Sequence, residues 1–217
     1  MSALPFVSAA DARATIPAVL THLRAGGLLA YPTETVYGLG CRAVAADVSA
    51  LAQLKGRAAG KPFLLLVASR EMAEGQGLAF NESARALARA FWPGPLTLVL
   101  PGGGGRLPDL LRGPEGGIAV RWTSHPLVAQ LVAALGEPLT STSANLPGSP
   151  PAPGADAILR DFAGPVAAGR LLVLDGGVLG NRPPSTVVDC TGPSPRVVRT
   201  GAISLAELRS GAGMLAP

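Results

Sequence analysis

The chain has 217 residues, a formal net charge of +4 and only 15% charged residues, while 48% of its residues are hydrophobic. This length suits one domain with a large core, or one domain with a short appendage. The mild positive charge fits an anionic small molecule or an RNA contact but requires neither. No segment approaches the roughly 18 apolar residues of a membrane span, and the N-terminus lacks the basic start and apolar stretch of a signal peptide, so no membrane association is expected.

The N-terminal half predicts helices that alternate with short buried strands. Thr15 is expected to cap a first helix over about residues 16–25, which a glycine pair ends. Asp47 is expected to cap a second helix that runs through Leu54 and carries Lys55 to its C-terminal end. Further periodic or apolar runs predict strands at 28–31, 63–68 and 96–100 and a helix at 82–91.

The C-terminal half continues this alternation and adds several closely spaced strands. The glycine-rich run at 101–105 is expected to form a flexible surface loop, and residues 146–154 a loop over a site. A short helix is expected in the tail after Gly201. The remaining runs predict strands at 118–122, 138–141, 171–174, 186–190 and 196–199 and a helix at 126–135. The pattern as a whole predicts an α/β fold in which helices cover a mixed sheet.

The lysines are concentrated in one short segment. Lys55 and Lys61 are the only two in the chain, and all other basic residues are arginines. A glycine-flanked Lys-x-Arg-x-x-x-Lys segment can surround several anionic oxygens, as a phosphate site requires, although a solvated basic helix end is the simpler alternative. A Walker A loop is not expected, because the spacer is one residue short and Pro62 replaces the Ser or Thr that would hold magnesium.

A second polar segment covers residues 31–40 and directly follows a predicted strand. Two threonine hydroxyls, a carboxylate and a tyrosine converge there with glycines that allow close backbone approach, at a strand end where open α/β sheets place ligand loops. Residues 38–43 match G-x-G-x-x-A, but residues 48–70 contain no Asp or Glu. A dinucleotide-binding site is therefore excluded.

Polar groups also follow other predicted strands. Five of the six residues in 140–145 are polar, which indicates either an ordinary turn or a ligand site at a buried strand end. Arg121 lies inside an apolar strand and needs an anionic partner if it is buried, or faces water if the strand is at an edge. Ser185 and Arg199 flank further strands, and a solvated role for Arg199 stays open.

Some residue types that other chemistries need are scarce. Cys41 and Cys190 match no metal spacing and form no disulfide framework, so a reduced, cytoplasmic environment is expected. The two histidines have no metal spacing; His22 is expected to be a surface or packing residue and His125 a helix cap. No G-x-S-x-G segment is present. Hydroxyls with fixed cations suit phosphoryl or nucleotidyl chemistry, where positioning and charge neutralisation dominate.

These segments together resemble the YrdC/Sua5/TsaC family of L-threonylcarbamoyladenylate synthases. The similarity rests on five stretches that occur in the family's order between about residues 10 and 203: YPTETVYGL at 31–39, KxRxxxKP at 55–62, WPGPLT at 92–97, STSAN at 141–145 and PSTVVD at 184–189. Each stretch alone is weak evidence, whereas five in register are highly specific.

The resemblance implies a YrdC/RibB-like fold, with a twisted mixed α/β sheet, flanking helices and a large concave cationic face. It implies a synthase domain over residues 1–203 and a short helix or tail over 204–217. The implied reaction converts L-threonine, bicarbonate and ATP, accompanied by Mg²⁺, into L-threonylcarbamoyladenylate and pyrophosphate. This would be the first step of threonylcarbamoyladenosine formation in tRNA, with downstream tRNA threonylcarbamoyl-transfer proteins as partners.

The resemblance also implies a role for each matching residue. L-Threonine or its carboxylate would be held by Thr33, Lys61, Arg121, Ser141 and Ser185. ATP would be held by Lys55, Arg57, Ser143, Asn145 and Arg199, and the first two of these, on the phosphates, would be the catalytic residues. Glu34 would face either the ligand or a neighbouring backbone.

The chain departs from the family pattern at three positions. Ala58 and Thr123 replace common prolines, and Pro147 replaces a common serine, which affects loop geometry more than chemistry. Two other functions stay open: a non-catalytic double-stranded RNA- or tRNA-binding module that uses the same concavity, and a carbamoyl-transfer maturation domain of related fold. The aromatic content of 4% argues against single-strand RNA recognition but not against duplex-shape recognition. The short chain argues against the maturation domain.

Overall fold

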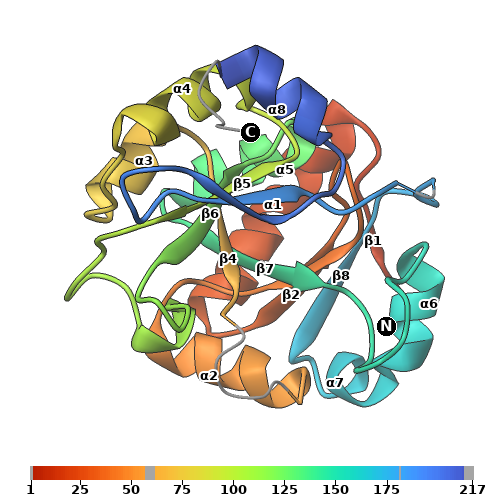
Figure 1. The fold of residues 1–217 in the computed structure, drawn as a ribbon. Coiled ribbons are helices and arrows are strands. Elements are labelled where there is room, and N and C mark those ends of the chain that lie inside the picture. Colours follow the sequence, from red (N-terminus) through yellow and green to blue (C-terminus); the bar gives the residue numbers. More distant parts are fainter. Residues whose placement is uncertain (1, 57–61, 181, 213–217) are drawn as a thin grey trace.

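A twisted mixed sheet runs through the molecule (Figure 1). The computed structural model describes residues 2–56, 62–180 and 182–212. Over these residues the strands are β1 (Leu4–Pro5), β2 (Leu28–Tyr31), β3 (Gly38–Gly40), β4 (Leu64–Val67), β5 (Leu96–Leu100), β6 (Ile118–Trp122), β7 (Leu139–Ser143), β8 (Leu171–Asp175), β9 (Thr186–Asp189) and β10 (Arg196–Arg199). Their order in the sheet is β1-β8-β2-β3-β7-β4-β6-β5-β9-β10. Parallel and antiparallel pairs are interspersed, so the predicted mixed α/β sheet is confirmed.

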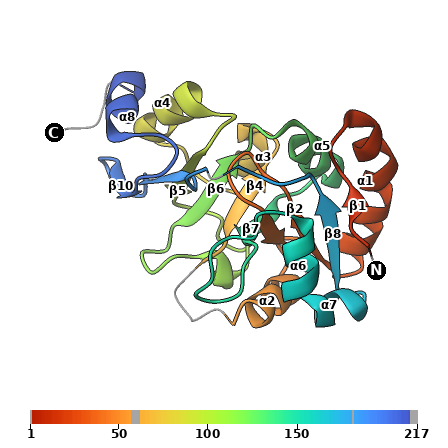
Figure 2. The ribbon, with the colours of Figure 1, turned by 90° about the vertical axis from the view of Figure 1, so that its right-hand side faces the viewer.

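Helices flank this sheet. They are α1 (Ala9–Arg24), α2 (Ala45–Leu54), α3 (Arg70–Gly75), α4 (Glu82–Phe91), α5 (Pro126–Leu135), α6 (Ala155–Asp161), α7 (Ala163–Ala167) and α8 (Leu205–Ala212), with a 3₁₀ turn at Asp109–Leu111. Figure 2 shows α4 and α8 together at one end of the sheet and α1 with α5 toward the other. Within the described part of the chain, no helix has the length and apolar character that a membrane crossing requires.

The two faces of the sheet contribute to two hydrophobic cores. Successive side chains of a strand point to opposite faces, and β2 illustrates this. Leu28 and Ala30 belong to the larger core, whereas Leu29 and Tyr31 pack into a smaller core with α1 and α5. Because both faces of the strand are covered, it is continuously apolar, as the sequence indicated.

The first helix begins earlier than predicted. Ser8, not Thr15, is its N-cap: the Ser8 hydroxyl accepts a hydrogen bond from the Asp11 amide at 3.1 Å, and the Asp11 carboxylate accepts the Ser8 amide at 2.9 Å. Thr15 is buried inside the helix and donates its hydroxyl to the Pro5 carbonyl. Pro17 lies in the helix interior. The capping box at Ser8 was the signal that identified the true start.

One other local prediction was wrong. Asp47 does not cap α2; Val44 occupies that position without a side-chain hydrogen bond, and Asp47 is buried one turn inside. The glycine-rich run at 101–105 forms a surface loop as expected. It is anchored on one side, because the Gly103 amide donates to the Gly77 carbonyl at 2.9 Å and Gly102 bridges to Leu78. The described remainder of the tail forms α8, whose Leu208 is fully buried beside α4.

Candidate functional site

Polar side chains from six separate segments line one cavity of about 340 Å³. It lies over the middle of the sheet, where β3, β7, β4, β6, β5 and β9 are neighbours. Six of the residues singled out from the sequence line it: Thr33, Arg121, Ser141, Ser143, Ser185 and Arg199. Strand order therefore brings together hydroxyls and cations that are up to 166 positions apart in the chain (from residue 33 to residue 199). The two arginines make this part of the site cationic.

A second hollow of about 660 Å³ adjoins the first. The two share the residues Thr35, Val36, Ser143, Pro184 and Arg199. The prolines of the 150–153 loop and of 183–184 form much of its wall. This agrees with the prediction that the 146–154 loop lies over a site. The larger hollow offers apolar proline faces, whereas the smaller one offers hydroxyls.

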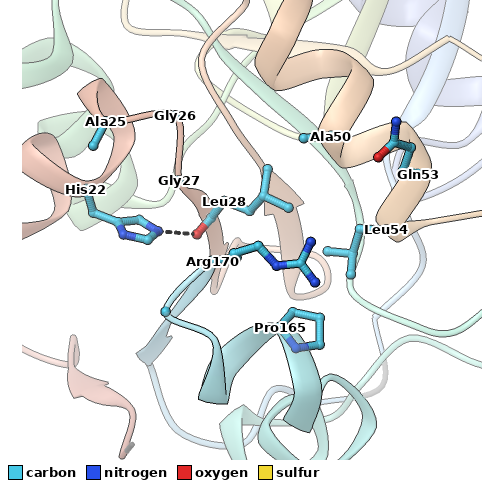
Figure 3. Close-up of a pocket in the computed structure, with 11 residues that line it drawn as sticks. His22, Ala25, Gly26, Gly27, Leu28, Ala50, Gln53, Leu54, Pro165 and Arg170 are labelled. Carbon is cyan, nitrogen blue, oxygen red and sulfur yellow. Dashed lines mark hydrogen bonds between the residues drawn. The ribbon is translucent and has the colours of Figure 1, made fainter.

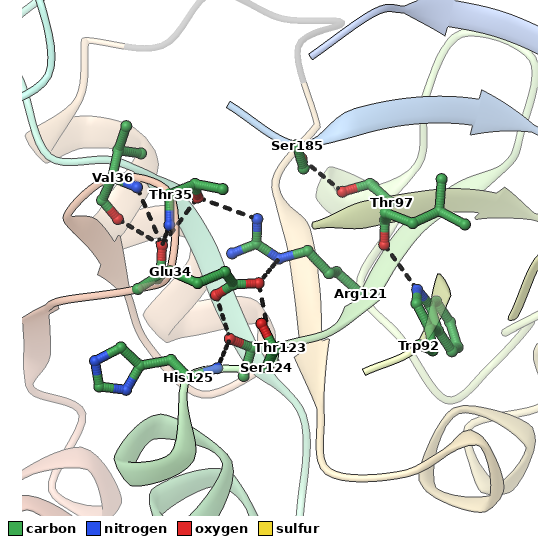
Figure 4. Close-up of polar contacts among 12 residues, drawn as sticks. Glu34, Thr35, Val36, Trp92, Thr97, Arg121, Thr123, Ser124, His125 and Ser185 are labelled. Atoms are coloured by element: carbon green, nitrogen blue, oxygen red, sulfur yellow. Dashed lines mark hydrogen bonds and ion pairs between the residues drawn. The ribbon is translucent and has the colours of Figure 1, made fainter. Parts of the chain in front are cut away.

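Arg121 is the buried charge of the smaller cavity. Its side chain is only 4% exposed, and Glu34 Oε1 lies 4.0 Å from its Nε atom. Its Nη1 donates to Thr35 Oγ1 at a long 3.4 Å, and Nε has no hydrogen-bond acceptor among the residues that the structure describes. A buried guanidinium normally satisfies its donors with close acceptors. Figure 4 shows Arg121 between Thr35 and Glu34. It lines the polar cavity with hydrogen-bond donors that are not fully satisfied, as a residue that receives an anion should.

Ser185 lies at the centre of a small hydroxyl network. Its Oγ atom is 2.9 Å from Thr97 Oγ1, and Arg199 Nη2 donates to Ser185 Oγ at 3.3 Å and to its carbonyl at 2.8 Å. β5 and β9 are parallel neighbours with Thr97 opposite Val187, and this register brings the two hydroxyls together. Burial and the nearby charge of Arg121 lower the pKa of Arg199, so an anionic ligand between them would relieve their repulsion.

Lys55 is buried but does not line the cavity. Its Nζ atom donates to the Ser143 carbonyl at 3.0 Å, to Asn145 Oδ1 at 3.0 Å and to the Asn145 carbonyl. Ser143 in turn donates to Asn145 Oδ1 at 2.6 Å. The predicted ATP residues Lys55, Ser143 and Asn145 therefore form one cluster. The other two residues of that segment, Arg57 and Lys61, lie outside the described residues.

The Thr33 hydroxyl is occupied by its own loop. Its Oγ1 atom donates to the Val36 carbonyl at 2.7 Å and accepts the amides of Thr35 and Val36. Since its single proton goes to Val36, the contact of 3.0 Å between Thr33 and Thr35 must use the Thr35 proton. Thr35 Oγ1 then faces Arg121 as an acceptor.

Three further threonines, Thr35, Thr97 and Thr142, line the cavity although the sequence assigned no individual ligand role to them. All three lie in stretches that carried the family resemblance, and that was the available signal. The tyrosine expected to converge there does not line the cavity: Tyr31 is fully buried and donates to the Thr140 carbonyl. Tyr37 likewise donates to the Gly177 carbonyl.

Other candidate groups are placed elsewhere. His125 caps α5 as predicted, accepting the Val128 amide on Nδ1, and burial lowers its pKa. Burial raises the pKa of each of the thiols of Cys41 and Cys190 to about 12, so both stay neutral at ordinary pH. Among residues 2–56, 62–180 and 182–212, no cluster of three or more His, Cys, Asp or Glu side chains is arranged to hold a metal ion.

A hollow of about 370 Å³ lies between α1, α2 and α7 (Figure 3). None of the predicted site residues that the structure describes lines it. His22 borders it but uses Nε2 on the Leu28 carbonyl at 2.9 Å, a packing role in agreement with the sequence. Arg170 is the cation at its rim. This hollow therefore provides a control region away from the candidate site.

Comparison with known proteins identifies the family. The sequence model of the Sua5/YciO/YrdC family, described as "Telomere recombination", matches residues 21–201. The chain belongs to the Sua5/YciO/YrdC family. The matched range includes every predicted site residue, so the whole candidate site lies within the family domain.

Similar members of the Sua5/YciO/YrdC family include two curated proteins and a solved structure. A threonylcarbamoyl-AMP synthase of Thiobacillus denitrificans is 41% identical over 174 residues, which cover 80% of this chain and 89% of that protein. One of Pyrococcus abyssi is 37% identical over 187 residues, covering 86% of this chain and 54% of that protein. The structure of P. abyssi Sua5 complexed with L-threonine superposes with a TM-score of 0.87 at 32% identity, over 99% of this chain and 61% of that one. The chain thus spans about half the length of the Pyrococcus relative.

Proposed function

We propose that this protein is a nucleotidyltransferase that makes L-threonylcarbamoyladenylate and pyrophosphate from L-threonine, bicarbonate and ATP. The observation that carries the proposal is the single cavity in which Arg121, Arg199, Ser141 and Ser185 converge. Support comes from its relatives that are named threonylcarbamoyl-AMP synthase and from the related Sua5 that was solved with L-threonine.

The proposed chemistry suits a site of hydroxyls and fixed cations. The threonine amine forms a bond to the carbon of bicarbonate or carbon dioxide, and the carbamate results with loss of water in the bicarbonate case. A carbamate oxygen then attacks the α-phosphorus of ATP, and the bond to pyrophosphate breaks. Both reactants are anions, so Arg121 and Arg199 would reduce their repulsion in a partly enclosed cavity.

We propose that threonine occupies the smaller cavity and the nucleotide the larger hollow. Arg121 would pair with the threonine carboxylate, and the Ser185–Thr97 hydroxyls would contact the polar groups of the amino acid. The shared border at Ser143 and Arg199 would then be where the carbamate meets the α-phosphate. Magnesium would enter with the ATP phosphates, because the described residues offer no carboxylate cluster to hold it separately.

We further propose that the product serves threonylcarbamoyladenosine formation in tRNA, in the cytoplasm, through downstream transfer proteins. A non-catalytic duplex-binding role is less suitable. The converging side chains at Thr97, Arg121, Ser141 and Ser185 are at most 5% exposed. A protein that recognises the shape of an RNA duplex does so through an open surface, and a duplex could not reach these buried side chains.

The test is a reconstituted reaction. Protein, ATP, Mg²⁺, bicarbonate and labelled L-threonine are mixed, and pyrophosphate release is measured. Release should require both threonine and bicarbonate, and labelled threonine should appear in an adenylate. Arg121→Ala should abolish most turnover, whereas Arg170→Ala, at the hollow of Figure 3, should not. Release without threonine would point to another acceptor and overturn the proposal.

A further inference from the structure

Glu34 lies between Arg121 and the start of α5 (Figure 4). Its Oε2 atom accepts the Thr123 hydroxyl at 2.5 Å, and its Oε1 atom accepts the Ser124 amide at 3.4 Å. The same Oε1 atom is 4.0 Å from Arg121 Nε. The carboxylate is therefore hydrogen-bonded to the turn that precedes α5, and it faces the arginine without bonding to it.

The gap between Glu34 and Arg121 is unusual for a buried pair. Charge-assisted N–H···O bonds are usually about 2.7–2.9 Å long, and arginine and carboxylate commonly form two of them. The two side chains are only 4% and 13% exposed, so water does not screen them well. Attraction across this gap should draw them together, and something must hold Glu34 back.

Thr123 is the group that holds Glu34. Its only hydroxyl proton is donated to Glu34, and its oxygen accepts the His125 amide at 3.1 Å. Thr123 is 1% exposed and therefore has little room to follow the carboxylate.

Glu34 is not among the residues that line the cavity, whereas Arg121 is. A direct role of this carboxylate on the ligand is therefore not favoured. Its effect on the ligand would pass through the arginine. A carboxylate at about 4 Å still attracts the positively charged guanidinium, but it leaves N–H groups of the guanidinium available to a ligand.

We infer that Thr123 and Glu34 are positioning residues: Thr123 holds the Glu34 carboxylate away from Arg121, so that donors of the buried guanidinium stay open to an anionic group in the cavity. That this group is the carboxylate of L-threonine rests on the proposed function. Without the hydroxyl, Glu34 would close onto Arg121 and compete with the ligand.

The first test is structural and does not depend on activity. In a crystal structure of Thr123→Val, a Glu34 oxygen should lie within about 3 Å of an Arg121 nitrogen. Thr123→Ser keeps the hydroxyl and should keep the wild-type separation, and Ser124→Ala keeps the backbone donor and should do the same. An unchanged separation in Thr123→Val would overturn the inference.

The second test is kinetic. Thr123→Val should raise the KM for L-threonine about tenfold, with kcat within about twofold of wild type, because a ground-state competitor has been created. Glu34→Gln added to Thr123→Val removes that competing charge and should lower the KM again. If Glu34 closes onto Arg121 in Thr123→Val but the KM for L-threonine stays at the wild-type value, the proposed effect on ligand binding is overturned. It is also overturned if Thr123→Val and Thr123→Ser lose kcat and thermal stability to the same extent. Wild-type protein without threonine-dependent turnover would defeat the proposed function, and the crystallographic distance would still decide the inference.

Discussion

Lys55 Nζ lies 3.0 Å from Asn145 Oδ1, although the two residues are 90 positions apart in the chain. The same ammonium also bonds the carbonyls of Ser143 and Asn145. It thus joins the C-terminal end of α2 to the turn after β7, where Ser143 borders both hollows. The resemblance assigns Lys55 to the ATP phosphates, and the geometry adds a tether that shapes the rim of the site.

Replacement of Lys55 should therefore affect both turnover and stability. In Lys55→Met, the acceptors at Ser143 and Asn145 lose a charged donor, which should lower the free energy of unfolding by about 1–3 kcal/mol. Turnover should fall at least about tenfold. Urea denaturation and pyrophosphate release measure the two effects. Lost turnover with unchanged stability would show that the tether contributes nothing and that the ammonium serves the ligand alone.

Thr33 offers a comparable separation of roles. In Thr33→Val, the amides of Thr35 and Val36 lose their acceptor, so the loop should weaken by about 1–3 kcal/mol, and threonine use should weaken with it. Thr33→Ser keeps the hydroxyl and serves as the matched control. The checks are thermal unfolding and the KM for L-threonine. A raised KM at full stability in the valine variant would instead place Thr33 directly on the amino acid.

Gly40 should tolerate no side chain. A Cβ atom there would lie 2.0 Å from the Thr140 carbonyl oxygen on the neighbouring strand β7. Gly40→Ala must separate two strands that carry the cavity, and a loss on the order of 2–4 kcal/mol is expected. Gly164→Ala is the control, because that position in α7 has nothing within 4 Å of an added Cβ. Equal unfolding midpoints for both variants would contradict the close contact.

Alkaline pH should destabilise the protein through its buried thiols. The pKa of both Cys41 and Cys190 is raised from 9.0 to about 12 by burial. Above pH 9 the unfolded chain releases protons that the folded chain retains, so stability present below pH 9 is lost as the pH rises toward 12. The slope approaches about 1.4 kcal/mol per pH unit for each thiol.

Unfolding free energies between pH 8 and 11 check this expectation. Cys41→Ala should flatten the pH dependence, although removal of the thiol group also lowers stability at neutral pH. In the native protein both thiols should react slowly with an alkylating reagent at pH 8. Rapid modification of Cys41 without unfolding would be inconsistent with its burial.

Strands β4, β5 and β6 were predictable because each is a mainly apolar run that closely follows a proline or glycine. β3 was missed because its three residues, Gly-Leu-Gly, carry almost no strand signal. The start of α1 was missed because the capping box at Ser8, a local signal, was overlooked. The position of β3 thus depends on its tertiary environment, whereas the start of α1 is encoded locally.

The candidate site was predictable as a set of segments but not in its detail. Arg121 was identified because a charge in an apolar strand requires an explanation. Which hydroxyls enter the cavity depends on strand register, and the sequence does not determine that Thr97 stands opposite Val187. The internal use of the Thr33 hydroxyl depends equally on loop geometry. The motifs therefore identify the segments of the site, whereas strand register and loop geometry determine which hydroxyl groups in those segments can contact a ligand.

The order in which the chain supplies the two sides of the cavity has a consequence for synthesis. Arg199 on β10 and Ser185 before β9 form one side, while the loop between β2 and β3 supplies Thr33 and Thr35 to the other. A nascent chain therefore lacks one side of the cavity until Arg199 has left the ribosome. Chains truncated before Arg199 should have no competent binding site even where they fold in part.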